Sequence, residues 1–183
     1  PYQPAGLWEE LAGGAGQGPY VPSTGADLVR RSLYTYRKRT VPHPTLTTFD
    51  APGFELCTVQ RSRTNTPLQA LALWNDPTYV EAARHLGARM LDAADDDAAR
   101  LAAGFRATLG RVASAAELDV LGRALEAHRL DYLGDGEAAA QYLAVGASAP
   151  SPAELAKRGA AEWAAFSLVA ATILNLDEAV TVR

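Results

Sequence analysis

The chain has 183 residues, 48% of them hydrophobic and 21% charged, a composition typical of one globular domain rather than of a disordered segment. A chain of this length typically buries about 70% of the surface that its unfolded state exposes, so it is long enough to form a core. Its formal net charge of −4 argues against nucleic acid as a partner, because nucleic-acid binders carry an excess of Lys and Arg. The single cysteine, Cys57, excludes an internal disulfide and a multi-cysteine metal site.

The first third of the chain is predicted to be irregular. The sequence begins with Pro1 and shows neither an initiator Met nor a signal-peptide pattern, so we expect it to be part of a longer protein. Residues 1–25 are interrupted by proline and glycine, which leaves room for one short turn near residues 7–11. Residues 40–65 lack helical periodicity and predict a long extended connection, with a short strand near residues 56–59.

One helix is predicted inside this irregular third. It begins at Ala26, and Val29, Leu33 and Tyr36 follow the spacing of one helix face. We expect the prolines at positions 42 and 44 to stop it.

The rest of the chain, from residue 66 onward, is predicted to be a helical bundle. Thr66 should cap the first helix, with Pro67 at its first position and Gln69 reaching back to the cap. Asp76 should cap the second helix in the same way. Similar signals predict helices at residues 67–74, 77–91, from the acids 95–97 to Gly110, from Ser114 to Gly134, at 137–145, from 151 onward, and at 160–174.

The expected fold class is therefore mainly α, with residues 1–65 irregular apart from one helix and residues 66–183 forming about five to seven helices of a single domain. The longest apolar stretch without charge, residues 163–176, is shorter than the ~20 residues that cross a bilayer, so we expect a buried helix and no membrane span.

Catalytic and metal-binding patterns were sought among the reactive side chains. The histidines His43, His85 and His128 stand in no diagnostic motif, and the last two lie on predicted helices, where a partly exposed histidine is ordinary. Cys57 and His43 share the long connection and could meet, but a lone cysteine is more often a small buried hydrophobe. We therefore predict no catalytic residue, no metal ligand and no cofactor in these residues.

One segment is a candidate anion site. Arg61 and Arg63 precede Asn65 and Thr66, which lead directly into a capped helix. Free amides at a helix N-terminus and guanidinium groups both favour an anion. In the alternative interpretation, which we favour, the two arginines pair with carboxylates of the domain and hold the loop in place.

Several motifs in order resemble those of a known family. They are Arg30 to Tyr36, Arg39 to Pro42, Thr48 to Pro52, Arg61 to Leu71, Trp74 to Pro77, Leu109 to Arg111, Glu117 to Leu118 and Leu174 to Glu178. With these motifs the chain resembles the PSD-type C-terminal domain of planctomycete cytochrome-c-containing proteins, domain of unknown function 1553.

The resemblance implies context and no catalytic residue. Members of that family usually follow a c-type cytochrome domain and a second uncharacterised domain in exported proteins, which implies a periplasmic or cell-envelope location. This chain has no Cys-x-x-Cys-His motif, so any haem would belong to the parent protein. The expected partners are the other domains of that parent.

Two functional interpretations follow. The first is a helical scaffold or interaction module of a larger exported protein, whose biochemical activity the sequence does not reveal. The alternative is a ligand-binding or enzymatic domain that uses the loop from Arg61 to Thr66 as an anion or carbohydrate site. We favour the first, because no acid, base or nucleophile is placed for catalysis.

Overall fold

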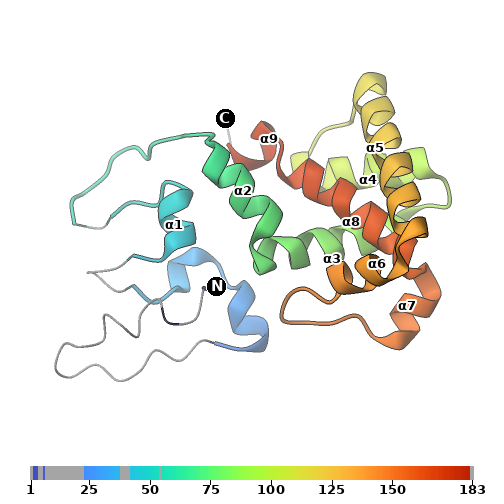
Figure 1. Ribbon diagram of the computed structural model, residues 1–183. Helices are drawn as coiled ribbons and strands as arrows, with labels where there is room; N and C mark the ends of the chain where they lie inside the picture. The colour runs from blue at the N-terminus through green and yellow to red at the C-terminus, as the bar shows by residue number, and fades with distance from the viewer. Residues whose placement is uncertain (1, 4–5, 7–22, 38–41, 54, 182–183) are drawn as a thin grey trace. The chain divides into compact units, whose positions relative to one another are not determined.

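The computed structural model describes residues 2–3, 6, 23–37, 42–53 and 55–181. It divides the chain into two compact units, Pro1–Gln69 and Ala70–Arg183 (Figure 1). The described residues form α-helices and short 3-10 helices and no β-strand, which confirms the mainly α fold class. The boundary between the units falls a few residues after the predicted change from irregular to helical chain at residues 65 and 66.

The described part of the first unit contains short helices joined by irregular chain. Two 3-10 helices, η1 (Gly25–Val29) and η2 (Ser32–Tyr34), stand where one continuous helix is predicted. That prediction is wrong because its apolar stripe has nothing to pack against: Val29 and Leu33 are 80% and 77% exposed. A short helix without a packed face is not stable in water. The predicted turn near residues 7–11 lies outside the described residues.

The long connection also differs from its prediction. Helix α1 (Pro44–Thr48) forms inside it, with Pro44 at its first position, where a proline starts a helix as readily as it stops one. The strand expected at residues 56–59 does not form, and Leu56 and Val59 are exposed to solvent. A lone strand without a partner strand or a buried face gains too little to persist.

The second unit is built from helices joined by short turns. Helix α2 (Pro67–Asn75) crosses the boundary between the units. It is followed by α3 (Pro77–Ala93), α4 (Asp97–Leu109), α5 (Ala115–Gly134), α6 (Gly136–Leu143), α7 (Pro152–Arg158), α8 (Ala160–Leu174) and α9 (Asp177–Val180). The predicted helices all form, whereas the short α9 was not predicted. Helix α8 contacts α3, α4, α5, α6, α7 and α9 and is the centre of this unit (Figure 1).

The predicted capping signals are confirmed. Ser114 and Glu117 form a reciprocal capping box at the start of α5, and Ser151 and Glu154 form another at α7. Gly110 ends α4 with φ of 70°, the left-handed conformation that glycine adopts without strain.

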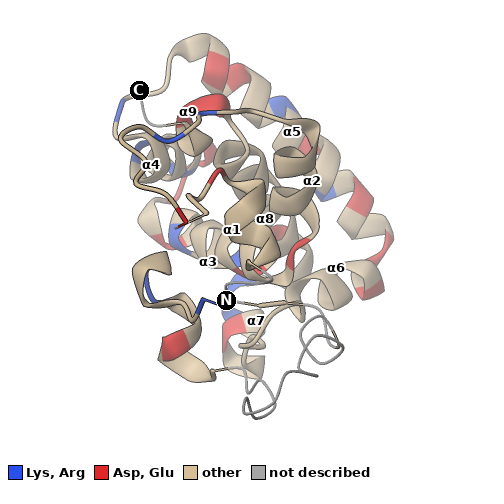
Figure 2. Cartoon of the chain, turned by 90° about the vertical axis from the view of Figure 1, so that its left-hand side faces the viewer, with Lys and Arg blue, Asp and Glu red and all other residues tan. Residues whose placement is uncertain are grey.

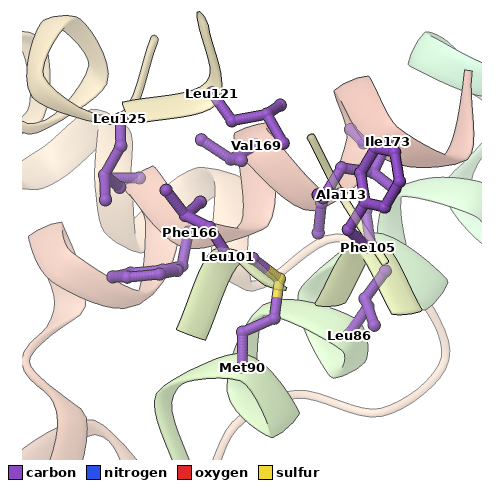
Figure 3. Close-up of a cluster of buried hydrophobic side chains, with 14 residues drawn as sticks. Leu86, Met90, Leu101, Phe105, Ala113, Leu121, Leu125, Phe166, Val169 and Ile173 are labelled. Atoms are coloured by element: carbon purple, nitrogen blue, oxygen red, sulfur yellow. The ribbon is translucent and has the colours of Figure 1, made fainter. Parts of the chain in front are cut away.

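The core lies around α8. Its side chains are apolar on nearly every side, as predicted, and most of its residues are buried. Side chains from α3, α4, α5 and α8 point toward one another in a single cluster (Figure 3). The labelled members are Leu86, Met90, Leu101, Phe105, Ala113, Leu121, Leu125, Phe166, Val169 and Ile173.

Candidate functional site

The loop from Arg61 to Thr66 is fastened to the end of α1. The Nη2 atom of Arg61 donates to the carbonyl oxygen of Phe49 at 2.8 Å, and its Nε donates to that of Asp50 at 3.2 Å. The Asp50 carboxylate accepts from the amide of Thr64 at 2.9 Å and from its hydroxyl at 2.7 Å. Asp50 has φ of 58°, a left-handed conformation that aspartate tolerates at such turns.

Gln69 holds the same loop from inside. Its side chain is 1% exposed, and its Nε2 donates to the Thr48 carbonyl at 2.9 Å and to the Thr64 hydroxyl at 3.0 Å. Its Oε1 accepts from the Thr66 amide at 2.8 Å, while the Thr66 hydroxyl accepts from the Gln69 amide at 3.3 Å. The predicted cap with a glutamine reaching back is therefore confirmed.

The four residues of the candidate anion site are not used alike. Arg61 and Thr66 form hydrogen bonds that hold the loop. Arg61, Arg63 and Asn65 are all exposed. Within the described parts of the chain the Arg63 side chain makes no hydrogen bond or ion pair. The carboxylate of this loop, Asp50, binds Thr64 instead of an arginine. The internal ties thus differ in chemistry from the expected arginine–carboxylate pairs, and the anion site itself stays a prediction.

The histidines and the cysteine are scattered. His43 is 3% exposed, whereas Cys57 is exposed, which corrects the expectation that this lone cysteine is buried. His85 and His128 lie on α3 and α5, and their side chains are 61% and 26% exposed, as expected for helical histidines.

Ser148, His85 and Glu81 come together where the α6–α7 loop meets α3. The Ser148 Oγ atom lies 3.3 Å from Nε2 of His85 and donates to the Glu81 carboxylate. In a Ser-His-acid triad the acid binds the Nδ1 atom of the histidine. Here Glu81 lies 3.8 Å from the same Nε2 atom that faces the serine, so the cluster tethers the loop and lacks triad geometry.

Arg84 is the buried centre of that tether. Its side chain is 2% exposed, and its Nη1 donates to the carbonyls of Leu143 at 2.6 Å and Val145 at 3.1 Å. Its Nη2 donates to Ser148 and to Glu81. Burial raises the pKa of Glu81, but the hydrogen bonds from Ser148 and its neighbour outweigh it and hold the pKa below its usual value. These contacts fix the loop after α6 onto α3.

Arg111 pairs with two carboxylates, one near it in the chain and one near the C-terminal end of the described residues. It binds Glu117 at 2.7 Å and Glu178 at 2.8 Å, and its guanidinium lies 4.7 Å from the centroid of the Phe105 ring. The hydrogen bonds from Arg111 and Ser114 lower the pKa of Glu117 to about 2. The turn after α4, the start of α5 and helix α9 therefore meet at one cation.

Arg129 joins three helices in the same way. From α5 it donates to Asp97 at the start of α4, at 2.6 Å, and to Glu162 on α8, at 2.9 Å. Its guanidinium lies 5.6 Å from the Phe166 ring centroid. The hydrogen bonds from Arg129 lower the pKa of Asp97. A bidentate cation between carboxylates and an aromatic ring orients helices and leaves no hydrogen-bonding group directed at a ligand.

Arg158 closes the set at the end of α7. It donates to Asp92 on α3 at 2.6 Å, beside Lys157 at 2.9 Å, and it lies 4.8 Å from the Trp163 ring centroid. The hydrogen bonds from Lys157 and Arg158 lower the pKa of Asp92. Sequence reasoning missed all four arginine ties, because each arginine has at least one partner far away along the chain.

Neither a metal-binding cluster nor a membrane-spanning helix occurs among the described residues. In those ranges no group of three or more His, Cys, Asp or Glu side chains could hold a metal ion. None of the described helices is both long enough and apolar enough to cross a membrane.

Comparison with known proteins supplies a family. The model of PSD1, a protein of unknown function (DUF1553), matches residues 1–125. The matched stretch includes Arg111 and Glu117 and ends before the closing motif of residues 174–178, which contains Glu178, the other partner of Arg111. No curated protein and no solved structure matched the chain. Since the family model covers more than half of the chain, the chain belongs to the PSD1 (DUF1553) family of unknown function.

Proposed function

We propose that this chain is a helical interaction module of a larger exported protein, and that helix α2 is its contact with another domain of that protein. The observation that carries the proposal is the apolar side of α2. Leu68, Leu71 and Trp74 follow one another at intervals of three residues, and they are 60%, 59% and 39% exposed. A contiguous exposed apolar face of this kind marks an interaction surface more often than a solvent-facing one.

Few contacts among the described residues stabilise helix α2. It has nine residues, and isolated helices shorter than about 12 residues are marginal in water. Its start is held by Thr66 and Gln69, and Asn175 donates to the Ala70 carbonyl at 3.4 Å. The extensive helix pairs of the second unit do not include α2. A partner that covers the apolar side would supply the missing stabilisation.

A neighbouring domain of the same protein is the partner that we propose. A covalently linked domain is present at a high effective concentration, so even a small apolar contact suffices to hold it. The resemblance to cytochrome-c-associated proteins supports the proposal of such a neighbour and of a periplasmic or cell-envelope location. Haem would then be bound by the parent's cytochrome domain and not by these residues.

The proposal can be tested by hydrogen exchange of α2. We expect the amides of residues 70–75 to exchange fast in this chain alone and to gain protection in the longer protein. The double variant Leu71→Ser and Trp74→Ser should abolish that gain, because it removes the apolar contact. Val112→Ser, at a residue that is 68% exposed outside α2, is the matched control and should leave the gain intact. Equal exchange of α2 in both proteins would contradict the proposal.

The anion site at the loop from Arg61 to Thr66 is the second candidate function. One observation favours it: Arg63 is exposed, makes no hydrogen bond or ion pair with another described residue, and stands four residues before the N-terminus of α2. Most other groups of this loop serve the fold, which is why we rank it second.

A further inference from the structure

The C-terminal end of α5 exposes two leucines that the fold does not use. Leu130 and Leu133 are 71% and 74% exposed. They share one face of the helix with Glu126, since the three residues follow the i, i+4, i+7 spacing. The core face of the same helix carries Leu121 and Leu125, which are buried, so the exposed leucines lie away from the core.

Carboxylates precede and follow these two leucines along the chain. Glu126 and Asp131 are 68% and 78% exposed, and the exposed Asp135 and Glu137 follow where α5 passes into α6. Figure 2 shows acidic positions recurring along α5 and at α6. We define the α5 end patch by the residues Glu126, Leu130, Asp131, Leu133, Asp135 and Glu137.

The arginines of α5 pair with only one carboxylate of this patch, Glu126, which lies 2.8 Å from Arg129. Arg123 lies two turns before Leu130 and pairs with Asp119 at 3.0 Å. Arg129 is only 19% exposed and shares its charge with Asp97, Glu162 and Glu126. His128 Nδ1 lies 4.0 Å from the Asp131 carboxylate, and burial lowers the pKa of His128 although Asp131 opposes that shift.

The position of the acids opposes the stability of α5. The C-terminus of a helix carries partial negative charge and favours basic residues in its last turn. The last turn of α5 has none, and Asp131 and Asp135 stand there instead. Asp135 gains one compensating contact, because its carboxylate accepts from the amide of Ala138 at 2.9 Å and caps α6. Asp131 takes no part in this cap, and its carboxylate lies 4.0 Å from Nδ1 of His128.

Two exposed leucines, and an aspartate in the last turn of α5, Asp131, both disfavour the chain on its own. Residues that break local rules without an internal benefit are commonly explained by function. We propose that the α5 end patch is the docking site of a basic amphipathic helix from a protein partner. The lysines or arginines of that helix face the carboxylates and the C-terminal carbonyls of α5, while its apolar side covers Leu130 and Leu133.

The charge of the patch decides the chemistry of this partner. An acidic or neutral amphipathic helix would gain the apolar contact but would face like charges or none. A basic polymer without an apolar side would gain the charges but would leave both leucines in water. Only a segment with both features matches the surface, and this requirement is independent of the contact proposed for α2.

The experiment uses the whole chain and a synthetic probe. The probe is a peptide of about 15 residues, long enough to form a helix, with leucines at i, i+3, i+4 and i+7 and lysines elsewhere. A peptide with the same residues in an order that lacks this spacing, and one with glutamates in place of the lysines, are the controls. Binding is followed by NMR of the labelled chain and by fluorescence anisotropy of the labelled peptides.

We expect the amphipathic basic peptide to bind and to shift the amide signals of residues 126–137. The double variant Leu130→Ser and Leu133→Ser should weaken binding at least about tenfold, a size typical of buried apolar anchors. Asp131→Asn with Glu137→Gln should weaken it about fivefold and reduce its salt dependence. Asp119→Asn, on the same helix but paired with Arg123, is the matched control and should leave binding unchanged.

Several results would overturn the proposal. Binding of the reordered basic peptide with equal affinity would show attraction by charge alone. Shifted signals outside residues 126–137 would place the site elsewhere, and insensitivity to the leucine variant would remove the apolar contact. Failure of these tests leaves the α2 proposal untouched, because that proposal is tested by protection of residues 70–75 in the longer protein.

Discussion

Each of the two units is stabilised by a different kind of interaction. Every buried hydrophobic side chain of the described residues lies in the second unit, between Val80 and Ile173. In the described part of the first unit, the two buried side chains are polar, namely His43 and Gln69. The second unit therefore rests on an apolar core that arginine ties orient. The described part of the first rests on hydrogen bonds between loops.

This difference has an energetic consequence. Burying one large apolar side chain stabilises a protein by roughly 1.5–3 kcal/mol, whereas one hydrogen bond contributes a net of about 0.5–1.5 kcal/mol. The first unit should therefore open at lower denaturant concentrations than the second. The following variants test this comparison.

The largest effect is expected in the apolar core. Phe166 is 0% exposed, and Phe166→Ala should lower the free energy of unfolding of the second unit by about 3–5 kcal/mol, because it removes apolar contacts and leaves a cavity. Urea unfolding monitored by circular dichroism measures the loss. Val112→Ala, at an exposed position, should change stability by less than about 0.5 kcal/mol. If Phe166→Ala changed the free energy of unfolding as little as Val112→Ala, the apolar core would not be what stabilises the second unit.

The matching test of the first unit is Gln69→Leu. Leucine keeps the approximate size of the side chain but leaves the Thr48 carbonyl and the Thr66 amide without their partner. We expect a loss of about 1–3 kcal/mol, seen as faster hydrogen exchange at residues 44–50 and 64–69. Gln60→Leu makes the same change at an exposed glutamine and should have little effect. If Gln69→Leu accelerated exchange in α3 and α8 equally, the two units would not be separable.

The close approach of α3 and α8 gives a pair of opposite effects. A Cβ atom on Gly87 would lie 2.9 Å from the Ser167 backbone nitrogen, whereas one on Gly122 would meet nothing within 4 Å. Gly87→Ala should destabilise the second unit by about 1–3 kcal/mol through overpacking. Gly122→Ala should stabilise it by about 0.5–1 kcal/mol through helix propensity. Thermal unfolding of both variants measures the contrast. A higher melting temperature for Gly87→Ala would contradict the tight contact between α3 and α8.

The arginine–carboxylate ion pairs of the second unit should make its stability fall at low pH. The folded pKa of Glu117 is about 2, below the ordinary value of 4.5, so this carboxylate stabilises the fold fully above pH 4.5. That contribution is lost as the pH falls from 4.5 toward 2, where Glu117 takes up a proton and releases Arg111. Glu117→Gln keeps a side chain able to complete the capping box but removes the charge. We expect the melting temperature of Glu117→Gln to change less with pH across this range than that of the natural chain. The melting temperature of Glu137→Gln should change with pH as much as that of the natural chain.

Local signals in the sequence predicted the second unit well. Caps such as Ser114 with Glu117 act between neighbours, and the apolar spacing of Leu101 with Phe105 reflects a core that exists. The same spacing at Val29 and Leu33 predicted a helix that does not form, since no packed surface meets it. Periodicity indicates a helix only where tertiary packing completes it.

The ties between helices could not be predicted from the sequence. Arg111 meets Glu178, and Arg84 meets the Leu143 carbonyl, across dozens of intervening residues. Nothing local distinguishes these arginines from Arg63, which stands in a motif but makes no such contact in the described chain. Pairing over long distances depends on how helices pack, which a single sequence does not encode locally.

The smallest effect on stability is expected at Arg63. From the sequence, an internal ion pair at this residue would make Arg63→Ala cost about 3 kcal/mol, because a buried carboxylate would lose its partner. The structure changes this expectation. Arg63 is exposed without a described partner, so the variant should unfold within about 0.5 kcal/mol of the natural chain. Arg61→Ala, which breaks the hydrogen bonds to the Phe49 and Asp50 carbonyls, should lower the stability more, by about 1 kcal/mol.

Inorganic sulfate, titrated into the labelled chain and followed by NMR, distinguishes an anion site at Arg63 from an internal ion pair. Shifts at residues 63–69 that disappear in the stable Arg63→Ala variant would establish the anion site, whereas a large loss of stability would restore the internal pair.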